Sequence, residues 1–203
     1  NQTTRRERIL RTAREQLAKL GYDGLSMRDL AAAAGVATTT LYNLYQSKDE
    51  LILEATRELL NDLAGQLQKQ NLAGIDLFIA SAKIAADIVV DNPAYAKAMA
   101  TMLFNAKPAD ASVITILTPM MMLYQEMLNG MRAEGILLSE TDVTYLARRL
   151  VADRWATILI WKQGYIALHD YKQESIQAQL AILKAFIVKG SQAETTVKKM
   201  LSE

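Results

Sequence analysis

The chain has 203 residues, of which 51% are hydrophobic, 22% are charged and three are prolines, a balance that excludes disorder and favours a compact, helix-rich protein. Its net charge of +1 at pH 7 does not by itself indicate a nucleic-acid partner. The absence of cysteine excludes disulfides and thiolate metal sites, and a single histidine, His169, leaves little for metal or acid–base chemistry.

The sequence also bears on membrane association, secretion and catalysis. The richest apolar run, residues 158–161, lies between Arg154 and Lys162, so no segment is long enough to cross a bilayer. The start of the chain is polar and rich in arginine, where a signal peptide would be apolar. We therefore expect a cytoplasmic protein without a membrane partner. We also expect no enzyme, no cofactor and no metal, because the sequence offers neither a nucleophile–base pair nor a metal cluster.

The first predicted element is an amphipathic helix. The run Thr4-Arg5-Arg6-Glu7 has the pattern of a capping box, and Gly21 ends the helical periodicity. Between them, apolar residues recur at helical spacing: Ile9, Ala13, Leu17 and Leu20. The first 14 residues also hold five arginines and one acidic residue: Arg5, Arg6, Arg8, Arg11, Arg14 and Glu7. Such a basic cluster can neutralise phosphates, or it can be a solvated helix face.

Two short helices are predicted next, joined by a tight turn at Gly35. The run Ser26-Met27-Arg28-Asp29 repeats the capping pattern and starts the first of them. In the second, residues 38–45, one face carries Leu41, Leu44 and Tyr45, and the opposite face carries Thr38, Thr39, Tyr42 and Asn43. Two short helices with a glycine-containing turn between them form the helix-turn-helix geometry, in which the second helix can enter a major groove.

A long helix is predicted to start at the capping box Ser47-Lys48-Asp49-Glu50. The positive end of a helix repels a lysine in its first turn, so the sequence reveals no stabilising role for Lys48. A phosphate, by contrast, would be attracted both by Lys48 and by the positive end of the helix. Tyr42 could be a core aromatic residue, but Leu41 and Tyr45 already occupy the apolar face. Arg28 is equally compatible with base contact and with solvation.

Several spaced segments of this region resemble the DNA-binding signature of the TetR (tetracycline-repressor) family of bacterial regulators. They are Gly21-Tyr22, residues 25–31, residues 34–36, Thr40-Leu41-Tyr42 and residues 47–51, within about residues 5–54. The resemblance implies an all-α protein. Residues 1–50 would form a three-helix helix-turn-helix DNA-binding domain, and residues 51–203 a helical-bundle domain for effector binding and dimerisation.

The resemblance also implies which residues contact DNA. The helix at 38–45 would read the major groove, and Tyr42 and Lys48 would hold phosphates. The predicted DNA-binding residues are Arg28, Thr38, Thr39, Thr40, Tyr42, Asn43 and Lys48.

Beyond residue 50 the sequence predicts helices over 72–90, 94–105, 113–133, 140–163 and 172–189. Pro93 suits the first turn of the second of these, after a capping Asn92. Pro119 is expected to kink the third or, with Thr118 as cap, to restart it. No Ser/Pro-rich linker separates the parts, so the helix from Lys48 is expected to join the two domains directly.

The middle helices are rich in methionine: Met99, Met102, Met120, Met121, Met122, Met127 and Met131. These residues fit irregular core filling, or an adaptable apolar pocket for a small lipophilic effector, as the resemblance implies. The predicted pocket residues are Met99, Phe104, Met122, Tyr124 and Trp155. Asp153 and Arg154 could serve an ion site, or pair with neighbours such as Arg149 or across a subunit interface.

Two apolar seams at helical spacing point to helix packing: Val143, Leu146 and Leu150, and Ile176, Leu180, Leu183 and Ile187. A monomer would bury such a seam in its own core, whereas the resemblance implies a homodimer interface.

The function predicted from these features is that of a transcriptional repressor. It would bind a near-palindromic, double-stranded DNA operator as a homodimer and be released by an apolar small-molecule effector. The alternative is a helical small-molecule-binding or protein-interaction module that has kept the scaffold without operator binding.

Overall fold

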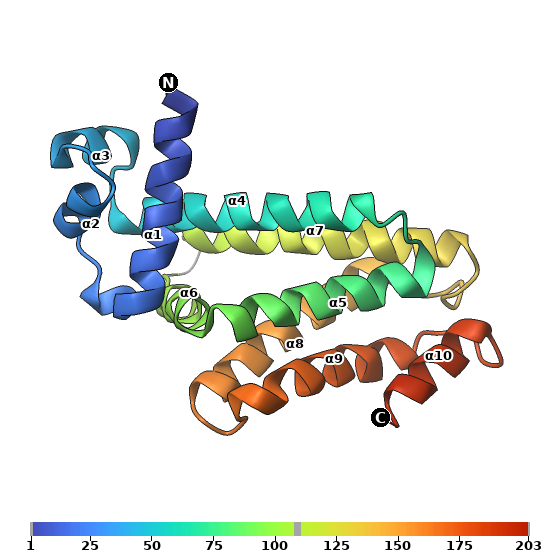
Figure 1. Ribbon diagram of the computed structural model, residues 1–203. Coiled ribbons are helices and arrows are strands. Elements are labelled where there is room, and N and C mark those ends of the chain that lie inside the picture. Colours follow the sequence, from blue (N-terminus) through green and yellow to red (C-terminus); the bar gives the residue numbers. More distant parts are fainter. Residues whose placement is uncertain (1, 108–110, 203) are drawn as a thin grey trace. The chain divides into compact units, whose positions relative to one another are not determined.

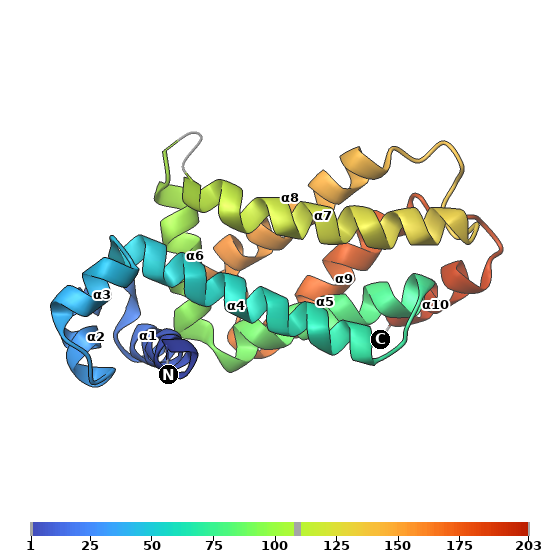
Figure 2. The ribbon, with the colours of Figure 1, turned by 90° about the horizontal axis from the view of Figure 1, so that it is seen from above.

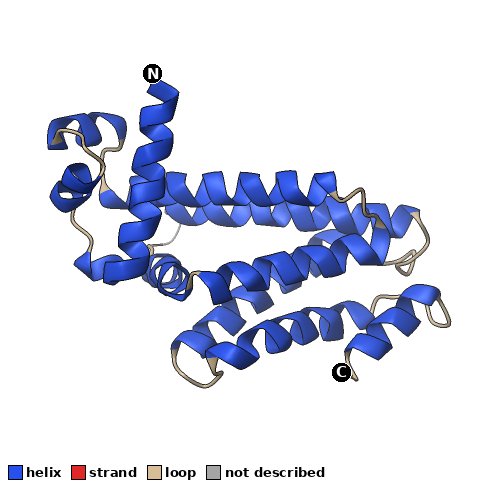
Figure 3. Ribbon diagram, in the orientation of Figure 1, coloured by secondary structure: helices blue, strands red, loops and turns tan. Residues whose placement is uncertain are grey.

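The computed structural model describes residues 2–107 and 111–202 (Figure 1). Within these ranges the chain forms ten helices and no strand, as Figure 3 shows, and one isolated antiparallel bridge joins Leu137 to Ile187. The prediction of an all-α fold is confirmed. None of the helices in the described ranges is both long and apolar enough to cross a membrane.

The helices follow one another with short connections. They are α1 (Gln2–Gly24), α2 (Met27–Ala33), α3 (Thr38–Leu44), α4 (Lys48–Lys69), α5 (Gly74–Asp91), α6 (Pro93–Asn105), α7 (Ala111–Ala133), α8 (Val143–Lys162), α9 (Leu168–Lys184) and α10 (Gln192–Met200).

The chain divides into two compact units. The first unit comprises the residues up to 63 together with 92–116, and the second comprises 64–91 together with the residues from 117 on. The helix α4 contributes residues to both units. The division between the units falls within α4, after residue 63, because residues 48–63 of α4 and the helix α6 belong to the first unit.

The core of the first unit forms around α1, which packs against α2 and α6. The apolar side of α1 is buried there: Ile9, Leu10, Ala13 and Leu17. Between α4 and α6, the buried Thr56 Oγ1 donates to the Ile52 carbonyl at 2.7 Å and lies 2.5 Å from the Tyr95 hydroxyl. Burial raises the pKa of Tyr95 to about 12, so its phenol stays protonated and can donate to Thr56.

The predicted helix caps are partly correct. The backbone N–H of Asp29 donates to Ser26 Oγ at 3.1 Å, and that of Glu50 donates to Ser47 Oγ at 3.1 Å, so two of the three predicted capping residues hold a helix start. Thr4, by contrast, lies inside α1, because that helix already begins at Gln2.

The predicted proline effects are also partly correct. Pro93 occupies the first turn of α6 as predicted, although the side chain of Asn92 makes no capping hydrogen bond. The helix α7 runs from Ala111 to Ala133 with Pro119 inside it, so the predicted restart at Thr118 is wrong.

In the second unit, α9 packs against α5, α8 and α10, and α10 folds back along the end of α9 (Figures 1 and 2). The start of α8 is Val143 rather than residue 140, because the carboxylate of Asp142 caps it by accepting from the Tyr145 N–H at 2.9 Å.

The predicted dimer seams lie in the core of this second unit. All seven side chains are at most 8% exposed within the single chain: Val143, Leu146, Leu150, Ile176, Leu180, Leu183 and Ile187. They fill the contact between α8 and α9 and their neighbours, so they present no surface to a second chain. The prediction that they form the dimer interface is therefore corrected, and a seam of this spacing serves the chain's own core here.

Candidate nucleic-acid interface

The helix-turn-helix is built from α2, a turn at Gly35 and α3. Gly35 adopts a φ of 64°, which glycine tolerates without strain, and the N–H of Val36 donates back to the Ala31 carbonyl at 3.0 Å. Leu30 and Ala31 on α2 are buried, and so is Leu41 on α3. These buried contacts fix the orientation of α3 relative to α2.

The helix α3 has one buried side and one exposed, uncharged side. Leu41 is fully buried and Tyr45, just after the helix, is nearly so. Of the predicted DNA-binding residues on this helix, Thr39, Tyr42 and Asn43 are exposed, and Thr38 and Thr40 are half-buried. The expectation that Leu44 faces inward is wrong: it is 43% exposed, because the helix ends there and only Leu41 and Tyr45 reach the core.

The predicted DNA-binding residue Arg28 extends from α2 into solvent. Its side chain is 85% exposed, and its Nε lies 3.7 Å from the Asp29 carboxylate. An ion pair this open contributes little to stability, so the guanidinium of Arg28 stays available to a partner.

Lys48 has a structural partner that the sequence does not reveal. Its Nζ donates to the Tyr22 carbonyl at 2.9 Å and lies 4.0 Å from the centre of the Tyr22 ring. The Tyr22 hydroxyl in turn donates to Asp49 Oδ1 at 2.5 Å. Burial, and then this hydrogen bond, raise the pKa of Tyr22 to about 12. Lys48 therefore has a stabilising role, contrary to the prediction, because its contacts with Tyr22 attach the end of α1 to the start of α4.

The arginines of α1 separate into two groups. Arg6 pairs with Glu54, and Arg14 pairs with Glu58 at 2.5 Å and donates to the Ala55 carbonyl at 3.4 Å. Both contacts hold α1 against α4. A signal for this lay in the sequence, because Arg6 and Arg14 stand four residues on either side of the buried Leu10 and so share its side of the helix.

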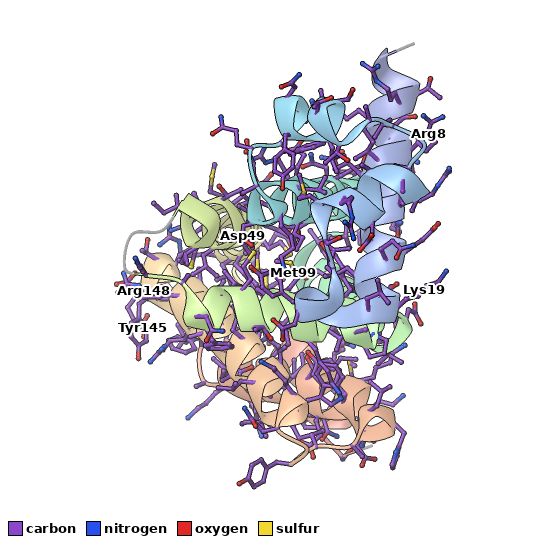
Figure 4. All side chains as sticks on the ribbon, turned by 90° about the vertical axis from the view of Figure 1, so that its left-hand side faces the viewer. Arg8, Lys19, Asp49, Met99, Tyr145 and Arg148 are labelled. Carbon is purple, nitrogen blue, oxygen red and sulfur yellow. The ribbon has the colours of Figure 1, made fainter. Side chains whose placement is uncertain are left out.

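The other three arginines of this cluster, Arg5, Arg8 and Arg11, are exposed and make no ion pair or hydrogen bond within the described part of the chain. Arg8, Arg11 and Lys19 are spaced so as to share one side of α1, and Figure 4 shows Arg8 and Lys19 extending from that helix in the same direction. These exposed cations are candidates for phosphate contact that were not singled out from the sequence.

The five predicted effector-pocket residues are not brought together within one unit. Met99 and Phe104 belong to the first unit, and Met122, Tyr124 and Trp155 to the second. Met99 is buried, and its sulfur lies 3.1 Å from Thr56 Oγ1. Phe104 and Met122 are exposed, Met122 by 63%, so these two do not line an enclosed cavity.

Comparison with known proteins identifies the N-terminal segment. Residues 9–55 match the family model for bacterial regulatory proteins of the tetR family. A 72-residue segment is 33% identical to the HTH-type transcriptional repressor KstR2 of Rhodococcus jostii (strain RHA1), and it covers 36% of this chain and 35% of that repressor. The match thus spans about a third of the length of this curated relative.

Solved structures resemble the chain over most of its length. Thermus thermophilus FadR, a TetR-family transcriptional repressor solved in complex with lauroyl-CoA, superposes with a TM-score of 0.71 at 22% identity, over 92% of this chain and 97% of that one. The fatty acid degradation regulator FadR from Bacillus halodurans gives a TM-score of 0.69 at 16% identity, over 85% and 96%. At these identities the likeness shows a shared fold. Residues 9–55 thus form a DNA-binding segment of the kind found in bacterial regulatory proteins of the tetR family, and the chain as a whole has the fold of these solved regulators.

Proposed function

We propose that the protein is a transcriptional repressor that binds a near-palindromic DNA operator as a homodimer and is released from it by a small, apolar effector. The observation that carries the proposal is the outer surface of the helix-turn-helix, where Thr39, Tyr42 and Asn43 are exposed on α3 and the guanidinium of Arg28 on α2 is open to solvent. The match of residues 9–55 to the tetR family model and the 72-residue match to the repressor KstR2 support it.

The chemistry of this surface suits two kinds of DNA contact. Hydroxyl and amide side chains on α3, such as those of Thr39 and Asn43, can donate to and accept from base edges in the major groove. The cations around them, Arg8 and Arg11 on α1 and Lys48 on α4, suit phosphates, which position a protein without reading sequence. Lys48 would contact a phosphate while it also donates its hydrogen bond to the Tyr22 carbonyl.

An exposed stripe on α8 is a better candidate for the dimer interface than the buried seams. Tyr145, Arg149, Ala152, Ala156 and Ile160 are all exposed and recur at intervals of four, three, four and four residues. Figure 4 shows Tyr145 extending outward from this helix. A groove of about 410 Å³ between α8 and α9 lies along the stripe and is lined by Tyr145, Arg149, Ala152, Asp153, Ala156, Ile182 and Phe186. Small alanines beside larger apolar side chains suit close helix packing between two copies.

Release by an effector is supported by the shared fold and by two residues of the second unit. Thermus thermophilus FadR, which shares this fold, was solved with lauroyl-CoA bound. The buried Tyr124 and the half-buried Trp155 are the predicted pocket residues that remain compatible with such a site. An effector must favour one of two arrangements of the DNA-binding helices, and it can shift them only by its differential affinity for each.

The proposal is tested by selecting bound sequences from a library of random DNA duplexes with the full-length protein. A near-palindromic consensus is expected, because a two-fold dimer presents two α3 helices to two half-sites. Failure to enrich any sequence would refute operator binding and favour a scaffold that binds only small molecules or proteins.

The first prediction concerns the exposed arginines of α1. Replacing Arg8 with alanine should flatten the dependence of log affinity on log salt concentration by about 0.9 for each phosphate that is no longer neutralised, with the sequence preference kept. Arg6→Ala is the matched comparison, because Arg6 is engaged by Glu54 and its replacement is expected to leave the slope unchanged. Titration of the selected duplex at several salt concentrations measures both. Equal slopes for the Arg8 variant and the unmodified protein would remove α1 from the interface.

A second prediction concerns the stripe on α8. The double change Ala152→Glu and Ala156→Glu is expected to raise the dimer dissociation constant at least about tenfold, because like charges then meet across the two-fold axis. Glutamate is a good helix former, so α8 should remain intact. Sedimentation equilibrium measures the change, with Gln173→Glu at an exposed position of α9 as control. An unaltered dimer would place the interface on another surface.

A further inference from the structure

Arg154 is the one buried charged residue among the described side chains, with 6% of its surface exposed. It lies on α8 in the second unit. No carboxylate oxygen of the described residues lies within 4.0 Å of its guanidinium. Removing a cation from water without an adjacent anion costs several kcal/mol in a protein, so its retention at this position calls for an explanation.

The nearest partner of Arg154 is a neutral phenol. Its Nε and Nη2 donate to the Tyr124 hydroxyl at 3.1 and 2.6 Å. That hydroxyl donates to Gln179 Oε1 at 2.7 Å, and Gln179 Nε2 donates to Asp153 Oδ2 at 2.6 Å and to the Leu150 carbonyl at 3.0 Å. These hydrogen bonds form a series: Arg154 donates to Tyr124, Tyr124 donates to Gln179, and Gln179 donates to the carboxylate of Asp153. The hydroxyl of Tyr124 is thereby held as an acceptor toward Arg154.

Donor capacity is left over beside this network. A guanidinium has five N–H groups, and two of them can serve the Tyr124 hydroxyl. The third nitrogen, Nη1, donates no hydrogen bond to the described residues. The group that complements unused donors is one that carries only acceptors.

We propose that Arg154 binds the carboxylate of an amphiphilic effector with an apolar tail, which rests on the proposed effector-dependent function. A planar guanidinium matches a carboxylate through two parallel hydrogen bonds. One buried cation balances one negative charge, which favours a monocarboxylate over a headgroup with several phosphates. The guanidinium carbon lies 5.7 Å from the centre of the Tyr124 ring, which packs against the Phe78 ring at 6.2 Å, so the surroundings of the cation are apolar.

The test compares ligands and variants in the full-length protein without DNA. Isothermal titration with decanoate, with decanol and with lauroyl-CoA separates the carboxylate from the tail and from a phosphate-bearing headgroup. Decanoate is expected to bind at least about tenfold more tightly than decanol, the range of a hydrogen bond to a charged group. Arg154→Met, which keeps the side-chain length, should remove this preference and leave decanol binding unchanged. The control is Arg148→Gln, an exposed arginine of the same helix.

A second readout separates a binding site from a structural role. If Arg154 is kept for a ligand, Arg154→Met should have an unchanged or higher Tm without ligand, because an unbalanced buried charge has been replaced by an apolar side chain. If that variant does not fold, Arg154→Lys, which keeps the charge, should bind decanoate more weakly than the unmodified protein and still prefer it to decanol.

Three results would overturn the proposal: no preference of the unmodified protein for decanoate over decanol, unchanged decanoate binding in a folded Arg154→Met variant, or lauroyl-CoA as the one ligand that depends on Arg154. Failure of the proposed function looks different. Decanoate would then bind through Arg154, while the affinity for the selected duplex would be absent or unaffected by decanoate.

Discussion

Replacing Leu180 with lysine is expected to unfold the second unit rather than to dissociate a dimer. Leu180 is fully buried on α9, where that helix packs against α8 and α5. The substitution removes a large apolar side chain and places an unpaired ammonium group in its position. Loss of a buried leucine side chain alone costs about 2–5 kcal/mol, and an unpaired buried charge adds to it, so the free energy of unfolding should fall by more than about 4 kcal/mol.

The comparison for this prediction is Gln173→Lys, at an exposed position of α9 outside the proposed dimer stripe. Urea denaturation followed by far-UV circular dichroism should show a large loss of stability for the first variant and a change within about 0.5 kcal/mol for the second, when both are measured as monomers. A folded Leu180→Lys protein that sediments as a monomer would instead return Leu180 to the subunit interface.

The helices could be predicted from the sequence because local chemistry determines where they begin. The serines at positions 26 and 47 satisfy backbone donors in a way that depends on residues three positions away, and Pro93 fits a first turn for equally local reasons. Thr4 matched the same pattern and failed, since α1 continues through it. A capping residue indicates where a helix can begin, whereas the observed start of α1 also depends on tertiary contacts such as its packing on α6.

The roles of charged and apolar residues were harder to predict, because they depend on what lies across from them. The spacing of Leu180 and Leu183 is the same whether the facing helix belongs to the same chain or to a second one. Lys48 looked unsupported in the sequence, since its partner, the Tyr22 carbonyl, lies 26 residues earlier. The Tyr22 carbonyl is placed by the preceding residue, Gly21, whose φ of 68° redirects the end of α1.

The largest expected loss of DNA affinity follows from a change at Thr39 of α3. Thr39 is exposed near the start of α3, the end of a recognition helix that usually reaches the base edges. Thr39→Glu is expected to keep the protein folded, because a carboxylate in the first turn interacts favourably with the positive end of the helix. The same carboxylate would face the phosphates of the operator in both half-sites. Like-charge contacts of this kind cost several kcal/mol, so the affinity for the selected duplex should fall at least about a thousandfold.

The control for this change is Thr39→Gln, which has nearly the same shape as the glutamate variant and no charge. The glutamine variant is expected to lose far less affinity and to alter mainly the preference at the base pairs near position 39, because an amide can still donate to and accept from base edges. Fluorescence anisotropy with the selected duplex measures both variants, and thermal unfolding checks that each is folded. Equal affinities of the two variants would show that this face of α3 does not approach DNA, since a full negative charge placed against phosphates cannot be neutral in its effect.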